Sequence, residues 1–228
     1  RIDEDKLFNL FSIYGNIMRI KILRNKPDHA LVQMGDGFQA ELAVHFLKLL
    51  ACPLLQPAPT TFSPVVTLLV HNLPPPKLSR GPTIILSAMA LCDLVLVLGT
   101  NPIGGHYWVG TMLFGKRLEV NFSKHPNITQ GPDTHEYMNS NLNRFNRNAA
   151  KNYRYCCSPT RIIHVSSLPQ DIIEIELASL LVEHGIIFNC KVFEMNGKKQ
   201  ALVQFETEEE ATEALVCKHA SSLSGSVV

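Results

Sequence analysis

The sequence predicts an α+β fold that occurs twice, because one pattern of helix, strand, turn, strand and helix is repeated along the chain. The first observation is a strand: Ala-Leu-Val-Gln-Met at 30–34 returns as Ala-Leu-Val-Gln-Phe at 201–205. The second is an apolar helix before each pair of strands, which stops at Gly15 in one copy and at Gly185 in the other. A repeat of this length indicates a duplicated domain and not a solenoid unit.

In the first copy, the spacing of apolar residues predicts each element in turn. Leu7, Leu10 and Tyr14 share one stripe at spacings of three and four, which is typical of a helix packed on a core. Strict alternation over 117–122 predicts a half-buried strand. The expected elements are helix 2–14, strands 17–23 and 29–34 around a turn at 24–28, helix 38–48 and strand 117–122.

The second copy starts at a strand around Ile162, Ile163 and Val165. Strands 187–193 and 200–205 and a last helix over 208–218 follow. The predicted domains are 1–48 with 112–124, and 161–228, joined by a polar linker at 125–160 that is flexible unless it docks. Because the first copy begins at its helix and the second ends at residue 228, we expect the first to lack its first strand and the second its last.

Residues 49–111 interrupt the first copy and differ from it in composition. They hold nine of the fourteen prolines and three charged residues. Since a connection between a helix and a strand normally takes a few residues, we expect a disordered or non-native insert, such as translated intron sequence. The alternatives are a proline-rich binding loop at 74–76 and a membrane span at 83–98. The span is too short, and Asp93 interrupts it.

Charge and cysteine content narrow the function. The net charge is +1, but Lys and Arg gather in 112–161, whereas 162–228 carry ten acidic residues against four Lys. This segregation suits an anionic partner that is held locally. The six cysteines show no Cys-x-x-Cys spacing, so we expect reduced thiols, no metal site and no cofactor; a metal site at Cys156, Cys157 and His164 is the alternative. The first residues, from Arg1 on, do not resemble a signal peptide.

Two octamers align with an RNA-binding pattern that runs basic, Gly, aromatic, small, aromatic, aliphatic, any, aromatic. They are residues 198–205 and 27–34, and residues 163–168 match the hexamer of a first strand. The chain therefore resembles the RNA recognition motif, which implies two ferredoxin-like domains with a four-stranded antiparallel sheet and two helices. The third and fifth octamer positions, normally aromatic, are Gln200 and Leu202 or His29 and Leu31.

The absence of these aromatic residues resembles the polypyrimidine tract-binding protein family, and the amino-acid sequence is most similar to the plant homologues of that family. The stretches that match its third domain and linker are 14–23, 28–37, 122–125 and 141–145, and the second copy is similar to its fourth domain. The resemblance leaves 49–111 without a counterpart. It implies binding of single-stranded, pyrimidine-rich RNA, a role in pre-mRNA splicing or mRNA processing, splicing factors as partners, packing of the two domains and no membrane partner. The implied location is the nucleus and also the cytoplasm.

Side chains that alternate with the buried ones should form the RNA-binding face, because alternate residues of a strand share a face. Imidazole, amide, aliphatic and Lys groups on that face can stack on and hydrogen-bond to splayed bases. The candidates are Arg19, Lys21, Leu23, His29, Leu31, Gln33, Ser123, Lys124, His125, His164, Ser166, Lys191, Phe193, Gln200, Leu202 and Gln204. The alternative for Leu31 and Leu202 is packing against the linker or the other domain. The acidic run 206–213 is expected to be a solvated helix face, turned away from RNA.

Two functions compete. The first is RNA binding, weakened in this chain by the two expected unpaired sheet edges. The second is a protein-interaction module that uses the same folds, with the proline-rich insert as a ligand. An enzyme is not expected, since no Ser/His/Asp set, carboxylate pair or phosphate-binding loop is present, and Gly104-Gly105 alone carries little information.

Overall fold

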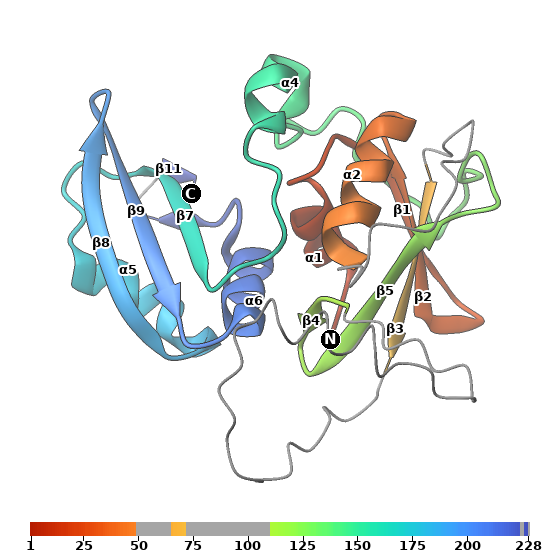
Figure 1. The fold of residues 1–228 in the computed structure, drawn as a ribbon. Coiled ribbons are helices and arrows are strands. Elements are labelled where there is room, and N and C mark those ends of the chain that lie inside the picture. Colours follow the sequence, from red (N-terminus) through yellow and green to blue (C-terminus); the bar gives the residue numbers. More distant parts are fainter. Residues whose placement is uncertain (49–64, 72–109, 224–225, 228) are drawn as a thin grey trace, which may run out of the picture.

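The computed structural model describes residues 1–48, 65–71, 110–223 and 226–227, which form two domains side by side (Figure 1). In each domain, helices cover one face of an antiparallel sheet, so the predicted α+β class is confirmed. Helix α1 (Glu4–Phe11) of the first domain and helix α6 (Glu208–Lys218) of the second lie between the two sheets (Figure 1). Among the helices of these residues, none is long and apolar enough to cross a membrane; the apolar stretch 83–98 lies outside them.

The described part of the first domain contains two helices and six strands. After α1 come β1 (Ile17–Leu23), β2 (Lys26–Met34), α2 (Gly37–Lys48), β3 (Val65–His71), β4 (Met112–Leu113), β5 (Lys116–Phe122) and β6 (His135–Glu136). The strand order is β4-β5-β3-β2-β1-β6. The expected stripe is buried, with Leu7 and Leu10 of α1 and Tyr14 after it at most 1% exposed. The helix itself ends at Phe11, before the predicted end at residue 14. Helix α1 begins after Asp3, whose carboxylate accepts a hydrogen bond from the backbone N–H of Lys6 at 2.9 Å.

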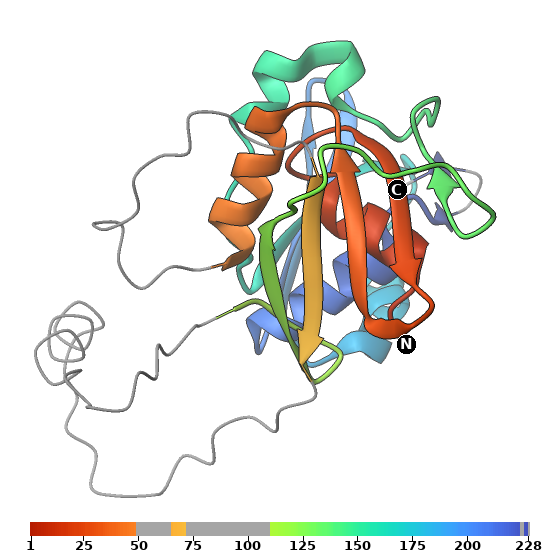
Figure 2. The ribbon, with the colours of Figure 1, turned by 90° about the vertical axis from the view of Figure 1, so that its right-hand side faces the viewer.

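Strand β3 corrects the expectation about the insert. It lies between β2 and β5 and is antiparallel to both, with Leu68 opposite Ala30 on one side and Val120 on the other (Figure 2). Val66 and Leu68 are fully buried. The expectation that the first domain lacks a strand, and that 65–71 is foreign to the fold, is therefore wrong at this position. The apolar segment supplies backbone partners to two strands that would otherwise be open edges.

The second domain is built around a smaller sheet. Its elements are β7 (Ile162–Leu168), α5 (Glu174–Leu181), the 3-10 helix η1 (Val182–His184), β8 (Ile187–Met195), β9 (Lys198–Phe205), α6, β10 (Ser222–Leu223) and β11 (Ser226–Val227). Within the described residues, the main sheet has three strands in the order β7-β9-β8, and β10 pairs with β11 in a sheet of its own. The core includes Leu177, Val203 and Phe205, all fully buried.

The 125–160 segment, expected to be a linker, docks on the first domain. It contributes β6 to the edge of the sheet and helix α4 (Phe145–Tyr153) beyond α2. Asn143 is 2% exposed and binds the start of β1, before the residues that pair with β6, since its side chain accepts from the N–H of Ile17 at 2.9 Å and donates to the carbonyl of Ile17 at 3.1 Å. A side chain thereby takes the place of a missing strand partner.

The two domains contact each other through α1 and α6. The Asn9 amide donates to the carbonyl of Val216 at 2.7 Å, and Val216 is buried within the core of the first domain. The carboxylate of Glu213 accepts from the N–H of Phe114 at 2.7 Å, in the turn between β4 and β5. Glu209 accepts from the N–H of the next residue in the same way. The expectation of a fully solvated acidic face over 206–213 is thus wrong for these two residues, because the turn presents two backbone donors to them.

Candidate nucleic-acid interface

The outer face of the second sheet carries the predicted side chains in rows across the three strands. Leu202 on β9 lies opposite His164 on β7 and Lys191 on β8. In the next row, Gln200 lies opposite Phe193. Ser166 follows His164 at the spacing that keeps it on the same face, and both are exposed. Leu202 is 44% exposed, which is unusual for a large apolar residue in the central strand of a sheet.

The polar and aromatic groups on this face are ordered by contacts among themselves. His164 Nε2 lies 2.8 Å from Gln200 Oε1. The rings of His164 and Phe193 have centroids 6.4 Å apart and are inclined by 28°. The two rings share the outer face with the exposed Leu202, so this face offers flat aromatic surfaces and an apolar side chain to unpaired bases.

Three further side chains share this face and were missed from the sequence. Ile162 and Asn189 lie on either side of Gln204, and Met195 follows Phe193 two residues later on β8. Ile162 is 49% exposed and Met195 50% exposed. The alternation of side chains along a strand could have identified them: Ile162 precedes His164 by two residues, so both point to the same side of the sheet.

The outer face of the first sheet has the same framework but is less open. Lys21 lies opposite Leu31, and Arg19 lies opposite Gln33. Leu23 at the end of β1, His29 and Leu31 are partly exposed. The imidazole Nδ1 of His29 lies 2.8 Å from Asp28 Oδ1, and this hydrogen bond lowers the pKa of the Asp28 carboxyl.

The chain that follows β5 crosses this face, as Figure 2 shows above the ends of β3, β2 and β1. Gln33 donates to Asn127 Oδ1 at 3.2 Å and accepts from the N–H of Ile128 at 3.1 Å. Gln33 is 9% exposed and Ile128 3%. The contact of Gln33 with RNA stays a prediction, and it requires the crossing segment to release the Gln33 amide, because that segment uses both ends of it.

The three candidates at the start of the crossing segment separate into two groups. Ser123 is 8% exposed, donates its backbone N–H to the carbonyl of Val65 at 2.9 Å and accepts from the N–H of His125 at 3.0 Å. Ser123 thus anchors the segment and is buried, whereas its contact with RNA stays a prediction. Lys124 and the His125 side chain are exposed beside the sheet.

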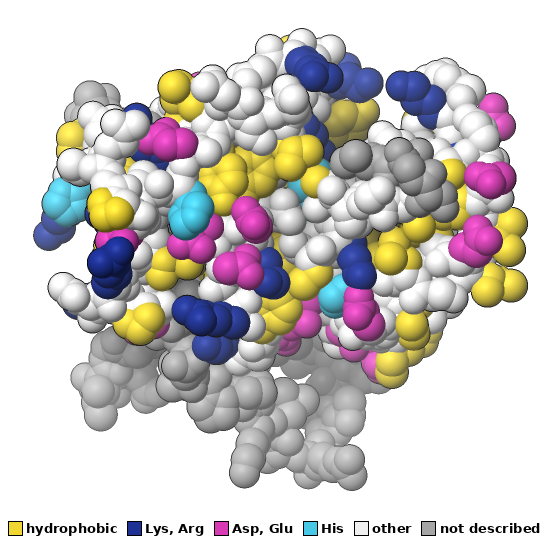
Figure 3. Space-filling view, turned by 180° about the vertical axis from the view of Figure 1, so that it is seen from behind, with side chains coloured by type: hydrophobic (Ala, Val, Ile, Leu, Met, Phe, Trp, Pro, Cys, Tyr) yellow, Lys and Arg dark blue, Asp and Glu magenta, His cyan; other side chains and the backbone are white. Residues whose placement is uncertain are grey.

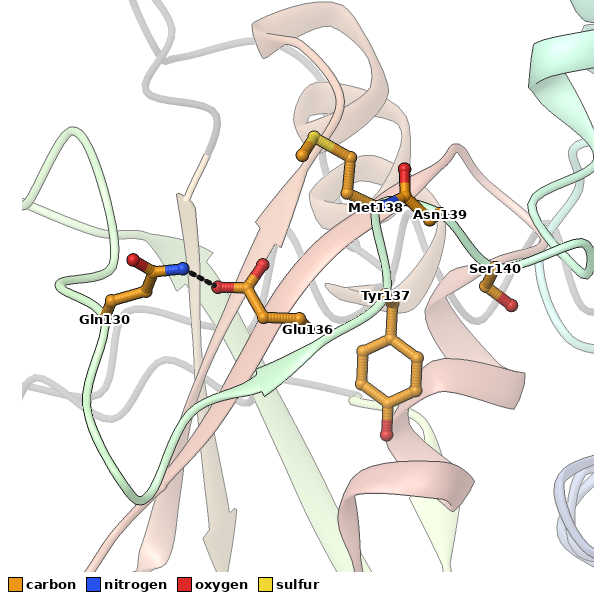
Figure 4. A pocket seen from close by; sticks show the side chains of 6 residues that line it. All are labelled: Gln130, Glu136, Tyr137, Met138, Asn139 and Ser140. Carbon is orange, nitrogen blue, oxygen red and sulfur yellow. Dashed lines mark hydrogen bonds between the residues drawn. The ribbon is translucent and has the colours of Figure 1, made fainter.

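Arg19 is held by the far end of the same segment. Its Nε lies 2.7 Å from Glu136 Oε1 on β6, and Gln130 donates to the same oxygen at 3.0 Å. Arg19 keeps the pKa of the Glu136 carboxyl below its usual range. Figure 4 shows Gln130 and Glu136 in a surface groove with Tyr137, Met138, Asn139 and Ser140. The positive charge of Arg19, one of the predicted RNA-binding residues, is therefore compensated within the protein.

The cysteines do not assemble a metal site in the part of the chain that the structure describes, where no group of three potential ligands occurs. Cys156 is packed near the interface between α1 and the linker, with Sγ 3.4 Å from the carbonyl of Ile13. Burial raises the pKa of the Cys156 thiol, which keeps it protonated.

Comparisons with known proteins agree with this geometry. The profile of the RNA recognition motif (RRM, RBD or RNP domain) matches residues 1–51 and 105–148, and a second such profile matches 163–228. Polypyrimidine tract-binding protein homolog 3 of Arabidopsis thaliana is 59% identical over 227 residues, which is 100% of this chain and 38% of that protein. Heterogeneous nuclear ribonucleoprotein L of Homo sapiens is 37% identical over 62 residues, 24% of this chain and 10% of that protein.

Fold, exposed sheet faces and profiles together define a protein with two RNA recognition motifs, that is, an RNA-binding protein. The chain belongs to the polypyrimidine tract-binding protein family. It spans 38% of the length of its Arabidopsis relative.

Proposed function

We propose that this chain binds single-stranded, pyrimidine-rich RNA, mainly through the outer face of the second sheet. The observation that carries this proposal is the exposed row of His164, Leu202 and Lys191 with Phe193 and Gln200 beside it. Rings and the leucine give stacking and apolar contact, the amides give hydrogen bonds to base edges, and Lys191 meets the phosphates.

The preference for pyrimidines follows from the size of this platform. Where many RNA recognition motifs present aromatic rings, these octamers present Gln200 and Leu202 or His29 and Leu31. A small base covers such a platform fully, whereas a purine overhangs it and gains less from stacking. The name of the Arabidopsis relative, a polypyrimidine tract-binding protein homologue, supports the same preference.

The first sheet contributes a second, weaker surface made of Lys21, Leu23, His29, Leu31 and the exposed Lys124 and His125. In the cell, the proposed role is regulation of pre-mRNA splicing or mRNA processing, with splicing factors as partners, in the nucleus and also in the cytoplasm. The role is that of a binding protein and not of an enzyme.

The test is fluorescence anisotropy with a labelled CU-repeat oligonucleotide and a labelled oligo(A) of equal length. We expect tighter binding of the CU repeat, and a loss of about tenfold for Phe193→Ala, since stacking on one base contributes roughly 1–3 kcal/mol. The matched control is Phe38→Ala on the helix side, at a residue that is 54% exposed. Equal affinity for both oligonucleotides, or unchanged binding by Phe193→Ala, refutes the proposal.

A further inference from the structure

Helix α5 is apolar on two faces, and only one of them belongs to the core of its domain. Leu177 and Leu181 are buried against the sheet. On another face, Ile175 is 75% exposed and Val182, seven residues later at the start of η1, is 61% exposed. Residues seven apart lie on one side of a helix, and that side is normally polar in a surface helix. The second apolar stripe therefore lies outside the core of this domain.

This stripe lines a groove together with the start of β8. Ile175, Ala178 and Val182 form one wall, and Ile186 and Ile187 the other, around a volume of about 850 Å³. Ile186 is 59% exposed and Phe188, next to Ile187 in the chain, 63% exposed. We call this the α5 groove. Clustered large apolar side chains at a monomer surface mark an interaction site more often than single ones do.

Two carboxylates, those of Glu183 and Glu210, lie at the α5 groove. Glu183 lines it, together with His184, whose Nε2 lies 3.4 Å from Glu183 Oε1. The side chain of Glu210 lies so close to Gly185 that a Cβ there would come within 2.4 Å of it. Lys218, ion-paired with Glu183, compensates one of these two charges. Seen from behind, hydrophobic side chains interspersed with Asp and Glu reach the surface of the second domain at the right of Figure 3.

The α5 groove has apolar walls and negative charge at its rim, and these two features indicate which kind of ligand it can bind. RNA is disfavoured, because its phosphates would meet the carboxylates of Glu183 and Glu210, while Lys218 compensates one of the two. A peptide with apolar side chains between Lys or Arg residues satisfies both features. We infer that the α5 groove docks a segment of a partner protein that carries Leu, Ile or Phe side chains flanked by basic residues. The groove lies on the helix side of the domain, so RNA can occupy the outer face of the sheet at the same time.

The experiment uses the whole chain, labelled with ¹⁵N, and a fluorescein-labelled synthetic peptide with alternating Leu, Ile and Phe between pairs of Lys. Matched peptides carry Glu in place of Lys, or Ser in place of the apolar residues. We expect the Lys peptide to shift the amide signals of Ile175, Val182 and Ile186, and the other two peptides to bind at least about tenfold more weakly. Ile175→Ser should lower the affinity for the Lys peptide by about tenfold, as expected when a side chain that anchors an interface is truncated.

Two controls separate docking from folding and from RNA binding. Ile175→Ser changes a side chain that is 75% exposed, so its thermal unfolding should match that of the unchanged protein. Leu202→Ser, on the opposite face, should leave peptide binding unchanged. The inference is overturned if the Lys peptide does not bind, if it binds Ile175→Ser equally well, or if the Glu peptide binds as tightly. It is also overturned if Ile175→Ser abolishes self-association of the chain, which would identify a second copy as the occupant.

Discussion

The two sheets present the same four-residue sequence, Ala-Leu-Val-Gln, in their central strands and expose it differently. In the second domain, Leu202 is 44% exposed and Gln204 remains partly exposed on an open face. In the first, Leu31 is partly exposed, and Gln33 is covered by the segment that follows β5. The strands are alike, so the difference comes from chain outside them. Whether a sheet face is open for binding therefore depends on the chain segments that cross it as well as on the residues of its strands.

The largest expected effect tests whether β3 belongs to the first sheet. Leu68→Ala removes a fully buried side chain between two strands, so we expect the first domain to lose about 2–5 kcal/mol of unfolding free energy. Hydrogen exchange measured at Val32 and at Val203 reports on the two domains separately. Exchange should accelerate at Val32 and stay unchanged at Val203. Leu202→Ala is the control, and an unchanged Val32 would place β3 outside the sheet.

The next effect contrasts two equivalent amides. Gln33→Ala should release the crossing segment and destabilise it by roughly 1–3 kcal/mol, because the buried N–H of Ile128 loses its acceptor. Gln204→Ala should leave stability unchanged and weaken RNA binding. Thermal unfolding and anisotropy on both variants measure the contrast. If Gln33→Ala keeps its stability and loses RNA affinity, the crossing segment does not cover the sheet in solution.

The matched leucines are expected to differ in RNA binding. Leu202→Ser should lower the affinity for a CU-repeat oligonucleotide by about tenfold. Leu31→Ser should lower it by less, since Leu31 is the less exposed of the two side chains. Isothermal titration with the two variants gives the ratio directly. An equal or larger loss for Leu31→Ser would make the first sheet the principal surface.

The last helix of the second domain, unlike α2 of the first, is capped at its C-terminus by a histidine, His219, which is partly buried. Burial, reinforced by Arg144, lowers the pKa of His219 to about 4 from an ordinary 6.5. The unfolded chain therefore binds a proton that the folded chain resists. The free energy of unfolding should be at its full value above pH 6.5 and fall as the pH drops towards 4, by at most about 1.4 kcal/mol per pH unit. Denaturant unfolding at several pH values should show that the free energy of unfolding depends less steeply on pH in His219→Asn. In His125→Asn, a change of an exposed side chain, this pH dependence should be that of the unchanged protein.

The smallest effect separates two cations of β1. Lys21→Ala should reduce the slope of log affinity against log salt concentration by about 1, which corresponds to the loss of one phosphate contact. Arg19→Ala should reduce it less, because Glu136 already pairs with the guanidinium. Affinities at several salt concentrations give both slopes. Equal slopes would mean that the Arg19–Glu136 pair opens when RNA binds.

Much of this architecture could be predicted from local pattern. The stripe of Leu7 and Leu10, the alternation in β5 and the outward His164, Phe193 and Leu202 all follow from helical and strand periodicity, and the structure places them as expected. Strand β3 was missed although its sequence, a run of apolar and β-branched residues at 65–70, is typical of a strand. The error lay in assuming that a first strand must precede its helix in the chain.

The sequence alone therefore determined the class of fold, the duplicated domain and which side of each strand faces outward, since these depend on neighbours a few residues apart. Only the tertiary structure decided that β3 joins β2 to β5, that Gln33 and Ser123 are covered, and that Glu209 and Glu213 bind a turn of the other domain. Each of these outcomes depends on a partner far away in the chain, such as Ile128 for Gln33. Periodicity assigns a side chain to a face, but long-range packing decides whether that face stays open.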